Sequence, residues 1–173
     1  MDESGFGLVP NVKRTWAPRG QTPYCPVTLK SGKINAIGAL VISPHQQRIT
    51  LYVRFSKRSI RSPQVKRFLA GVMGHHRGQI MLLYDHSRTH TCKLVQTFLD
   101  AHPRVLREPF PEYAPELNPV EQVWSYADAA LASGAPDTVA QLTAKLRRII
   151  AKLKSSQALL WACIYASDLP WRH

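Results

Sequence analysis

The clearest pattern along the chain is the alternation of apolar and polar residues in residues 48–55 (RITLYVRF). The apolar positions of this segment are Ile49, Leu51, Val53 and Phe55. Such alternation predicts a strand with one buried face. Residues 34–42 (INAIGALVI) read as a second strand, and the short polar link SPHQQ between the two predicts an antiparallel hairpin. We expect residues 3–9 to form a further strand.

Apolar residues at helical spacing predict several helices. The first begins at Ser62 and Pro63, the second spans residues 90–101, and a third spans residues 137–153 with Asp137 as its cap. The buried faces of the first two are expected to be Val65, Phe68, Leu69 and Val72, and Leu94, Val95, Phe98 and Leu99. The residues from 155 onwards are expected to add one more short helix.

A continuous apolar run, Ile80–Tyr84, ends directly at Asp85. An apolar run of this length followed by a helix is typical of a buried strand in a parallel sheet. Asp85 would then lie at the carboxyl end of that strand, where open α/β sheets carry their sites. With a short strand at residues 104–108, the order of elements predicts an α/β fold with a mixed sheet flanked by helices.

The segment Pro109–Trp124 (PFPEYAPELNPVEQVW) combines a proline-rich turn with a well-marked helix start. Asn118 is expected at the N-cap, Pro119 at the first helical position and Glu121 at the third. Two interpretations of Glu121 follow. Its carboxylate is aimed at a site from a fixed helix start, or it closes a capping box with the Asn118 amide.

The chain of 173 residues carries 23 basic and 11 acidic residues, a net charge of +12. This balance favours a polyanionic partner, and nucleic acid is the usual one. The densest basic run contains no acidic residue and comprises Arg54, Lys57, Arg58, Arg61, Lys66 and Arg67. We interpret it as a surface that contacts DNA phosphates, and the alternative is a solvated basic face.

Cysteine usage and hydropathy exclude several classes of protein. Cys25, Cys92 and Cys163 are far apart and form no Cys-x-x-Cys pair, so neither a zinc site nor a disulfide framework is indicated. The apolar runs are too short to span a membrane. The opening residues MDESGF are acidic and do not resemble a signal peptide. We therefore expect a cytoplasmic protein.

Three segments together carry a family resemblance: DESGF followed by RTWAPRGQTP, then LLYDHSRTH, then PELNPVEQVW. From residue 2 to about residue 126 the chain resembles the catalytic domain of bacterial insertion-sequence transposases of the mariner superfamily. The most specific part is the pattern Tyr-x-Pro-x-Leu-Asn-Pro-x-Glu-x-x-Trp. The resemblance implies an RNase H-like fold, metal-dependent cutting and joining of DNA, and a nucleoid-associated protein of a bacterial cell.

The resemblance also implies a catalytic triad of Asp2, Asp85 and Glu121, which would bind two Mg²⁺ or Mn²⁺ ions. Asp85 is expected to bridge the ions, with Asp2 and Glu121 each holding one side. Oxygen ligands of this kind suit these cations. Asp2 would lie on a central strand whose first half is missing, so the first strand is expected to be truncated.

The residues that would support the metal ligands are His86, His90 and Asn118. The family usually has Asn where this chain has His86, directly after the second aspartate. His90 matches a histidine of the family and would orient a phosphate, although a histidine at a helix start is as readily structural.

We expect one catalytic domain over residues 1–173, with a core at about 1–132 and C-terminal helices at about 137–165. No helix-turn-helix module is expected ahead of it. The resemblance implies DNA partners, both transposon ends and target, a homodimer in a synaptic complex, and a separate N-terminal DNA-binding polypeptide. Two alternatives remain: another RNase H-like nuclease such as a resolvase, or a catalytically inactive, basic DNA-binding remnant.

Overall fold

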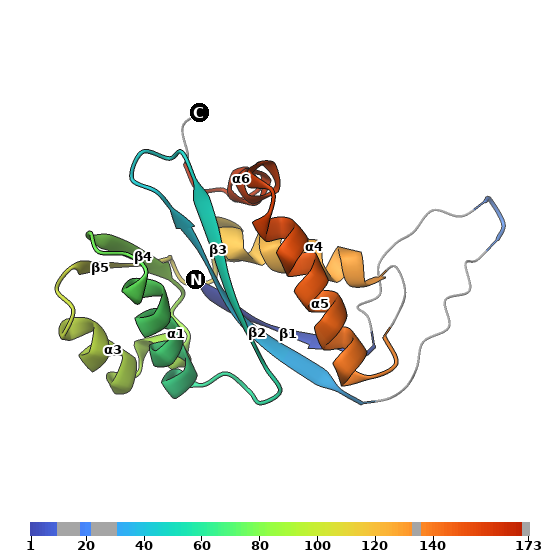
Figure 1. The fold of residues 1–173 in the computed structure, drawn as a ribbon, viewed down its shortest axis with the longest axis horizontal. Helices are drawn as coiled ribbons and strands as arrows, with labels where there is room; N and C mark the ends of the chain where they lie inside the picture. The colour runs from blue at the N-terminus through green and yellow to red at the C-terminus, as the bar shows by residue number, and fades with distance from the viewer. Residues whose placement is uncertain (10–17, 22–30, 133–135, 171–173) are drawn as a thin grey trace.

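The computed structural model describes residues 1–9, 18–21, 31–132 and 136–170. Three antiparallel strands, β1 (Asp2–Gly7), β2 (Lys33–Ile42) and β3 (Ile49–Ser56), form one sheet in the order β1–β2–β3 (Figure 1). The hairpin of β2 and β3 pairs Ile42 with Ile49, as the sequence predicts. Most of the motif RTWAPRGQTP lies outside the described residues.

Two further strands, β4 (Ile80–Tyr84) and β5 (Val105–Pro109), pair in parallel. The parallel pairing of β4 is therefore confirmed, but its complete burial was a wrong expectation. Met81 is 63% exposed because the two-stranded ribbon leaves one face partly open. The backbone nitrogen of Met1 donates a hydrogen bond to the Leu83 carbonyl oxygen at 2.8 Å, which joins the start of β1 to the end of β4.

Helices α1 (Ser62–Gly74) and α3 (Lys93–Asp100) pack beside the parallel ribbon, together with the short α2 (Arg88–Thr91) (Figure 1). The predicted single helix over residues 90–101 is divided, because Cys92 has an extended backbone, with φ −65° and ψ 154°. The division shifts the phase of the apolar face. Val95 and Leu99 are buried, whereas Leu94 is 43% exposed and does not belong to the buried side.

The opposite face is covered by α4 (Pro119–Ala132), α5 (Val139–Lys154) and α6 (Gln157–Tyr165), and a short 3₁₀ helix, η1 (Pro115–Leu117), precedes α4 (Figure 1). The predicted cap of α5 was one residue off. Thr138 is the N-cap, and its hydroxyl accepts from the Gln141 amide. No helix in the described ranges is both long and apolar enough to span a bilayer.

The alternation of side chains along β2 produces two separate cores. Ile34 and Ala36 point into the core shared with α4, α5 and α6, whereas Ile37 and Ala39 point into the core shared with α1 and α3. The three-stranded sheet is thus the middle layer of the molecule, and helices flank it on both sides. The α/β prediction is confirmed, and β1 and β4 meet where their neighbouring ends carry Asp2 and Asp85.

Candidate active site

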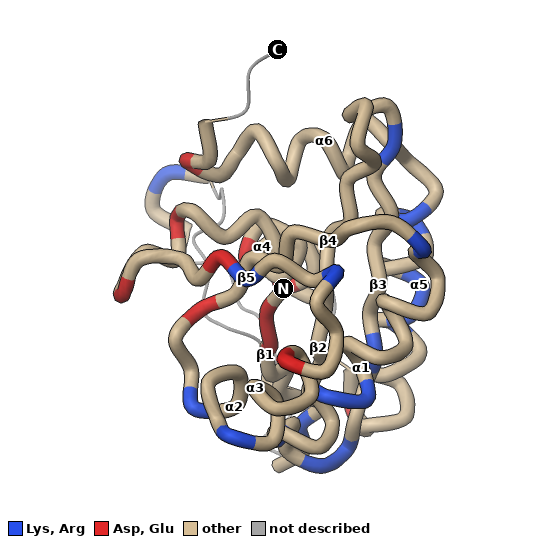
Figure 2. Tube along the Cα trace, turned by 90° about the vertical axis from the view of Figure 1, so that its left-hand side faces the viewer, with Lys and Arg blue, Asp and Glu red and all other residues tan. Residues whose placement is uncertain are grey.

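The three carboxylates singled out by the sequence line one cleft of about 380 Å³. Asp2 comes from the start of β1, Asp85 follows the end of β4, and Glu121 lies in the first turn of α4. The described part of the cleft's rim continues through residues 110–115, which link β5 to η1. Figure 2 shows acidic positions around the start of β1 and basic positions around α1 and α5.

Asp2 is held by an indole packed across the sheet. Its carboxylate is almost completely buried, and Oδ2 accepts a 2.9 Å hydrogen bond from Nε1 of Trp124. Asp2 pairs with Gly38 on β2, where a Cβ atom would lie 2.7 Å from the Trp124 ring. The absence of a side chain at Gly38 therefore makes room for the indole. Burial, and then the charge of Glu121, raise the pKa of Asp2 to about 7.

Glu121 points into the cleft from a helix start that is capped by other groups. Oδ1 of Asn118 accepts from the Val120 amide at 3.2 Å, which confirms the predicted N-cap. The backbone amide of Asn118 donates to the Pro115 carbonyl oxygen at 2.9 Å. Over the described residues it is not bonded to Glu121, so the capping-box interpretation is not supported. Burial raises the pKa of Glu121, and the charge of Asp85 adds to this effect.

Asp85 lies beside a buried cation. Nδ1 of His90 is 2.5 Å from Oδ1 of Asp85, and Nε2 of His90 is 2.9 Å from Oε1 of Glu3. Burial works against charge on this completely buried ring, but its two carboxylate partners outweigh burial and raise the pKa of His90 to about 9. The hydrogen bond from His90 in turn holds the pKa of Asp85 below its usual value.

The chemistry of this donor set fits divalent cations. Burial raises the pKa values of both Asp2 and Glu121, and the charge of a neighbouring acid adds to each, from Glu121 on Asp2 and from Asp85 on Glu121. A bound cation would relieve both effects. Carboxylate oxygens are the ligands preferred by Mg²⁺ and Mn²⁺. In the ranges that the structure describes, no three His, Cys, Asp or Glu side chains are already grouped to hold a metal ion.

The other predicted residues divide into those at the cleft and those away from it. His86 and Asn118 line the cleft, whereas His90 lies behind Asp85 and contacts its carboxylate. None of the predicted DNA-contacting residues is among the described lining residues. All of them are exposed, and the described residues provide no ion pair for any of them: Arg54, Lys57, Arg58, Arg61, Lys66 and Arg67.

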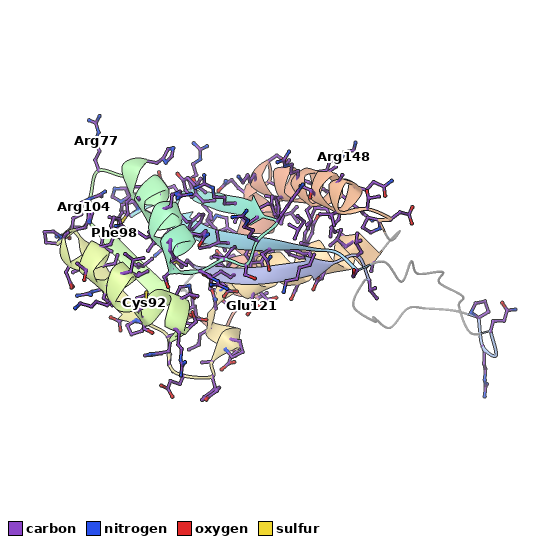
Figure 3. All side chains as sticks on the ribbon, turned by 90° about the horizontal axis from the view of Figure 1, so that it is seen from below. Arg77, Cys92, Phe98, Arg104, Glu121 and Arg148 are labelled. Atoms are coloured by element: carbon purple, nitrogen blue, oxygen red, sulfur yellow. The ribbon has the colours of Figure 1, made fainter. Side chains whose placement is uncertain are left out.

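Figure 3 shows Glu121 near the strands, well away from Arg148 on the outer side of α5. Three residues of the site were not predicted from the sequence: Glu3, Gly38 and Trp124. Trp124 was named as part of the family pattern, but no contact with Asp2 was predicted for it. Glu3 could have been predicted from its position directly after Asp2. Neighbouring residues on a strand point to opposite faces, so Glu3 can contact the other side of the same site.

An antiparallel sheet and a parallel strand pair flanked by helices, with carboxylates at adjoining strand ends and at a helix start, define an α/β protein with an acidic cleft. The family model for DDE superfamily endonucleases matches residues 1–143, and the chain belongs to this family. None of the curated proteins compared with the chain matches it.

Solved structures of Mos1 transposase share the fold. The Mos1 paired-end complex with the left transposon end is 15% identical, with a TM-score of 0.66 over 95% of this chain and 50% of that chain. The Mos1 catalytic domain alone is 14% identical, with a TM-score of 0.55 over 75% of this chain and 74% of that chain. The chain thus spans about half the length of the first of these relatives. The predicted RNase H-like fold is confirmed.

Proposed function

We propose that this chain is the catalytic domain of a mariner-type transposase, which cuts DNA strands and joins the cut ends to a target. The observation that carries the proposal is the single cleft lined by Asp2, Asp85 and Glu121 in a chain with a net charge of +12. Membership of the DDE endonuclease family supports the chemistry of phosphodiester cutting. The fold supports the mariner type.

Two divalent ions, Mg²⁺ or Mn²⁺, are part of this proposal. Similar Mos1 paired-end complexes contain Mg or Mn. Asp85 would be the shared ligand, and Asp2 and Glu121 would each hold one ion. When bound, such ions would supply activation of the attacking oxygen and stabilisation of the leaving one. Trp124 fixes Asp2 through Oδ2, and the capped start of α4 fixes the direction of Glu121.

The DNA would lie across the exposed basic run between β3 and α1. These side chains are exposed and free of ion pairs within the described residues, so their charge is available to phosphates. The similar Mos1 structure contains a transposon end. We propose that transposon-end and target DNA, a homodimeric synaptic complex and a bacterial nucleoid location complete the functional setting.

The test of the proposed reaction is cleavage of a supercoiled plasmid with and without Mn²⁺. Asp85→Asn and Glu121→Gln should each reduce the metal-dependent cleavage rate about 100-fold or more. The loss of a metal ligand should reduce the rate more than the loss of a residue that only supports a ligand. Glu116→Gln is the matched control, because it removes one exposed carboxylate outside the described cleft lining. Equal cleavage by Glu121→Gln and the parent would refute the triad. Joined products would separate a transposase from a resolvase-like nuclease.

The test of the basic surface is the dependence of DNA affinity on salt. Reversing Arg58, Arg61 and Arg67 to Glu should flatten the plot of log affinity against log salt by about 0.9 for each lost phosphate contact. The control reverses exposed basic residues of α5, namely Arg147, Arg148 and Lys152, for the same change in net charge. Equal slopes for the two triple variants would show that the run between β3 and α1 has no special role.

A further inference from the structure

His90 is the only charged side chain that the structure describes as 0% exposed, and it lies between two carboxylates. Its Nδ1 contacts Asp85 at 2.5 Å and its Nε2 contacts Glu3 at 2.9 Å. Its backbone is held as well, because the side-chain amide of Gln96 donates to the His90 carbonyl at 3.0 Å. The Tyr84 ring packs edge-on against the imidazole. The ring therefore has one position and one orientation.

The contacts of Asp85 are concentrated on one oxygen. Oδ1 contacts Nδ1 of His90 and accepts from the Ser87 amide at 3.0 Å. The Asp85 carboxylate is 45% exposed and lines the cleft, whereas Glu3 on the other side of the ring is 20% exposed. The chain of contacts thus runs from strand β1, through a buried ring, to a carboxylate at the cleft surface.

Strand β1 contributes to both sides of the site in this way. Asp2 and Glu3 are neighbours on an extended strand, so their side chains leave it on opposite faces. Asp2 meets Trp124 on one face, and Glu3 meets His90 on the other. A buried histidine needs only a backbone carbonyl to satisfy a ring nitrogen. The use of a second carboxylate here ties Asp85 to the strand that carries Asp2.

We infer that Glu3 and His90 are positioning residues that fix Asp85 through Oδ1 and leave Oδ2 for a divalent metal ion. The inference rests on the proposed function, in which Asp85 is a metal ligand. Neither residue touches the metal or the DNA in this arrangement. Their effect is on the direction in which the ligand is presented, and groups in such supporting positions typically change metal affinity by 10–100-fold.

The test uses pairs of variants with equal charge. In His90→Asn the amide nitrogen occupies the place of Nδ1 and can still donate to Asp85. In His90→Gln it occupies the place of Nε2 and can donate only to Glu3. Both variants lose the same ring. We expect His90→Asn to bind Mn²⁺ about tenfold more tightly than His90→Gln, measured by electron paramagnetic resonance of free Mn²⁺ without DNA.

The second pair changes Glu3, whose side chain is less buried than the ring. Glu3→Gln keeps an oxygen that accepts from Nε2, whereas Glu3→Ala leaves that nitrogen without its partner. We expect Glu3→Ala to bind Mn²⁺ about threefold more weakly than Glu3→Gln. Thermal unfolding of every variant identifies loss of fold, and if either His90 variant does not fold, the Glu3 pair decides.

Two reference proteins distinguish the possible failures. If the parent binds Mn²⁺, Asp85→Asn does not, and the members of each pair bind equally, then the positioning inference is wrong while the proposed function stands. If the parent itself binds no Mn²⁺, or Asp85→Asn binds as well as the parent, then the proposed function fails and the inference falls with it. A difference within both pairs, in the expected direction, supports the inference.

Discussion

Two carboxylates of the cleft, Asp2 and Asp85, have opposite surroundings. Asp2 is buried against an indole and faces another acid, and its pKa is raised to about 7. Asp85 is half-exposed and contacts a buried histidine, and its pKa is lowered. A buried histidine thus supports Asp85, whereas burial and the charge of Glu121 act against the ionised form of Asp2 and outweigh the nearby amino group of Met1. The side of Asp2 and Glu121 is where a cation would relieve the greatest electrostatic cost.

The largest effect on stability is expected where the Asp2 side depends on close packing. Gly38→Ala would put a Cβ atom 2.7 Å from the buried ring of Trp124. We expect it to lower the free energy of unfolding by about 3 kcal/mol. Gly71→Ala on exposed α1 is the matched control, since nothing lies within 4 Å, and it should raise stability by up to about 1 kcal/mol. Similar values from chemical denaturation would contradict the packing argument.

A smaller effect is expected from the charge of Asp2. Because its pKa in the folded protein is raised from 3.8 to about 7, the folded state retains the proton longer, and stability falls as pH rises through that window. Without metal, Asp2→Asn should match the parent near pH 4. At pH 8 it should be more stable by about 2 kcal/mol, allowing for proton sharing with Glu121.

The measurement for Asp2 is urea unfolding of both proteins across this pH range. The contribution of His90, whose pKa is raised to about 9, is common to the two proteins and cancels in the comparison. Addition of Mn²⁺ at pH 8 should reduce the stability difference between the parent and Asp2→Asn, because the bound cation offsets the negative charge of Asp2. A stability difference that does not depend on pH would mean that the pKa of Asp2 is not raised in the folded protein.

The smallest effect concerns the start of α4. Asn118→Ala should lower the free energy of unfolding by about 1 kcal/mol, since it removes the oxygen that caps the Val120 amide. Glu121→Gln should change it by less, because the Asn118 amide is bonded to Pro115 and not to Glu121. Equal destabilisation by the two substitutions in metal-free denaturation would return Glu121 to the role of a cap.

Much of the fold was predictable because its elements follow local rules. The alternation in residues 48–55 defined β3, and the Asn118–Pro119 pair defined the start of α4 within a residue. The position of Asp85 followed from the apolar run that precedes it. The single helix predicted over residues 90–101 failed because of the backbone geometry at one residue. Cys92 interrupts a helix although the apolar spacing continues across it.

The contacts that support the site were not predictable, because they join residues far apart in sequence. Trp124 has the spacing of a core residue, and nothing local shows that its indole nitrogen reaches Asp2. His90 contacts Glu3, which lies 87 residues away in sequence, and this contact exists only once β1 and α2 are placed together. Gly38 gives no local signal either, because its role is to leave space for another element.

We propose that the acidic side of the cleft, with Asp2 and Glu121, and the histidine-supported side, with Asp85, bind the metal ions together. The most direct test of this proposal is anomalous diffraction from crystals of the protein soaked in Mn²⁺. We expect anomalous density in the cleft, in contact with a carboxylate oxygen of Asp85. Asp2 or Glu121 should be the other protein ligand of each ion. Density elsewhere in the molecule with an empty cleft would contradict it.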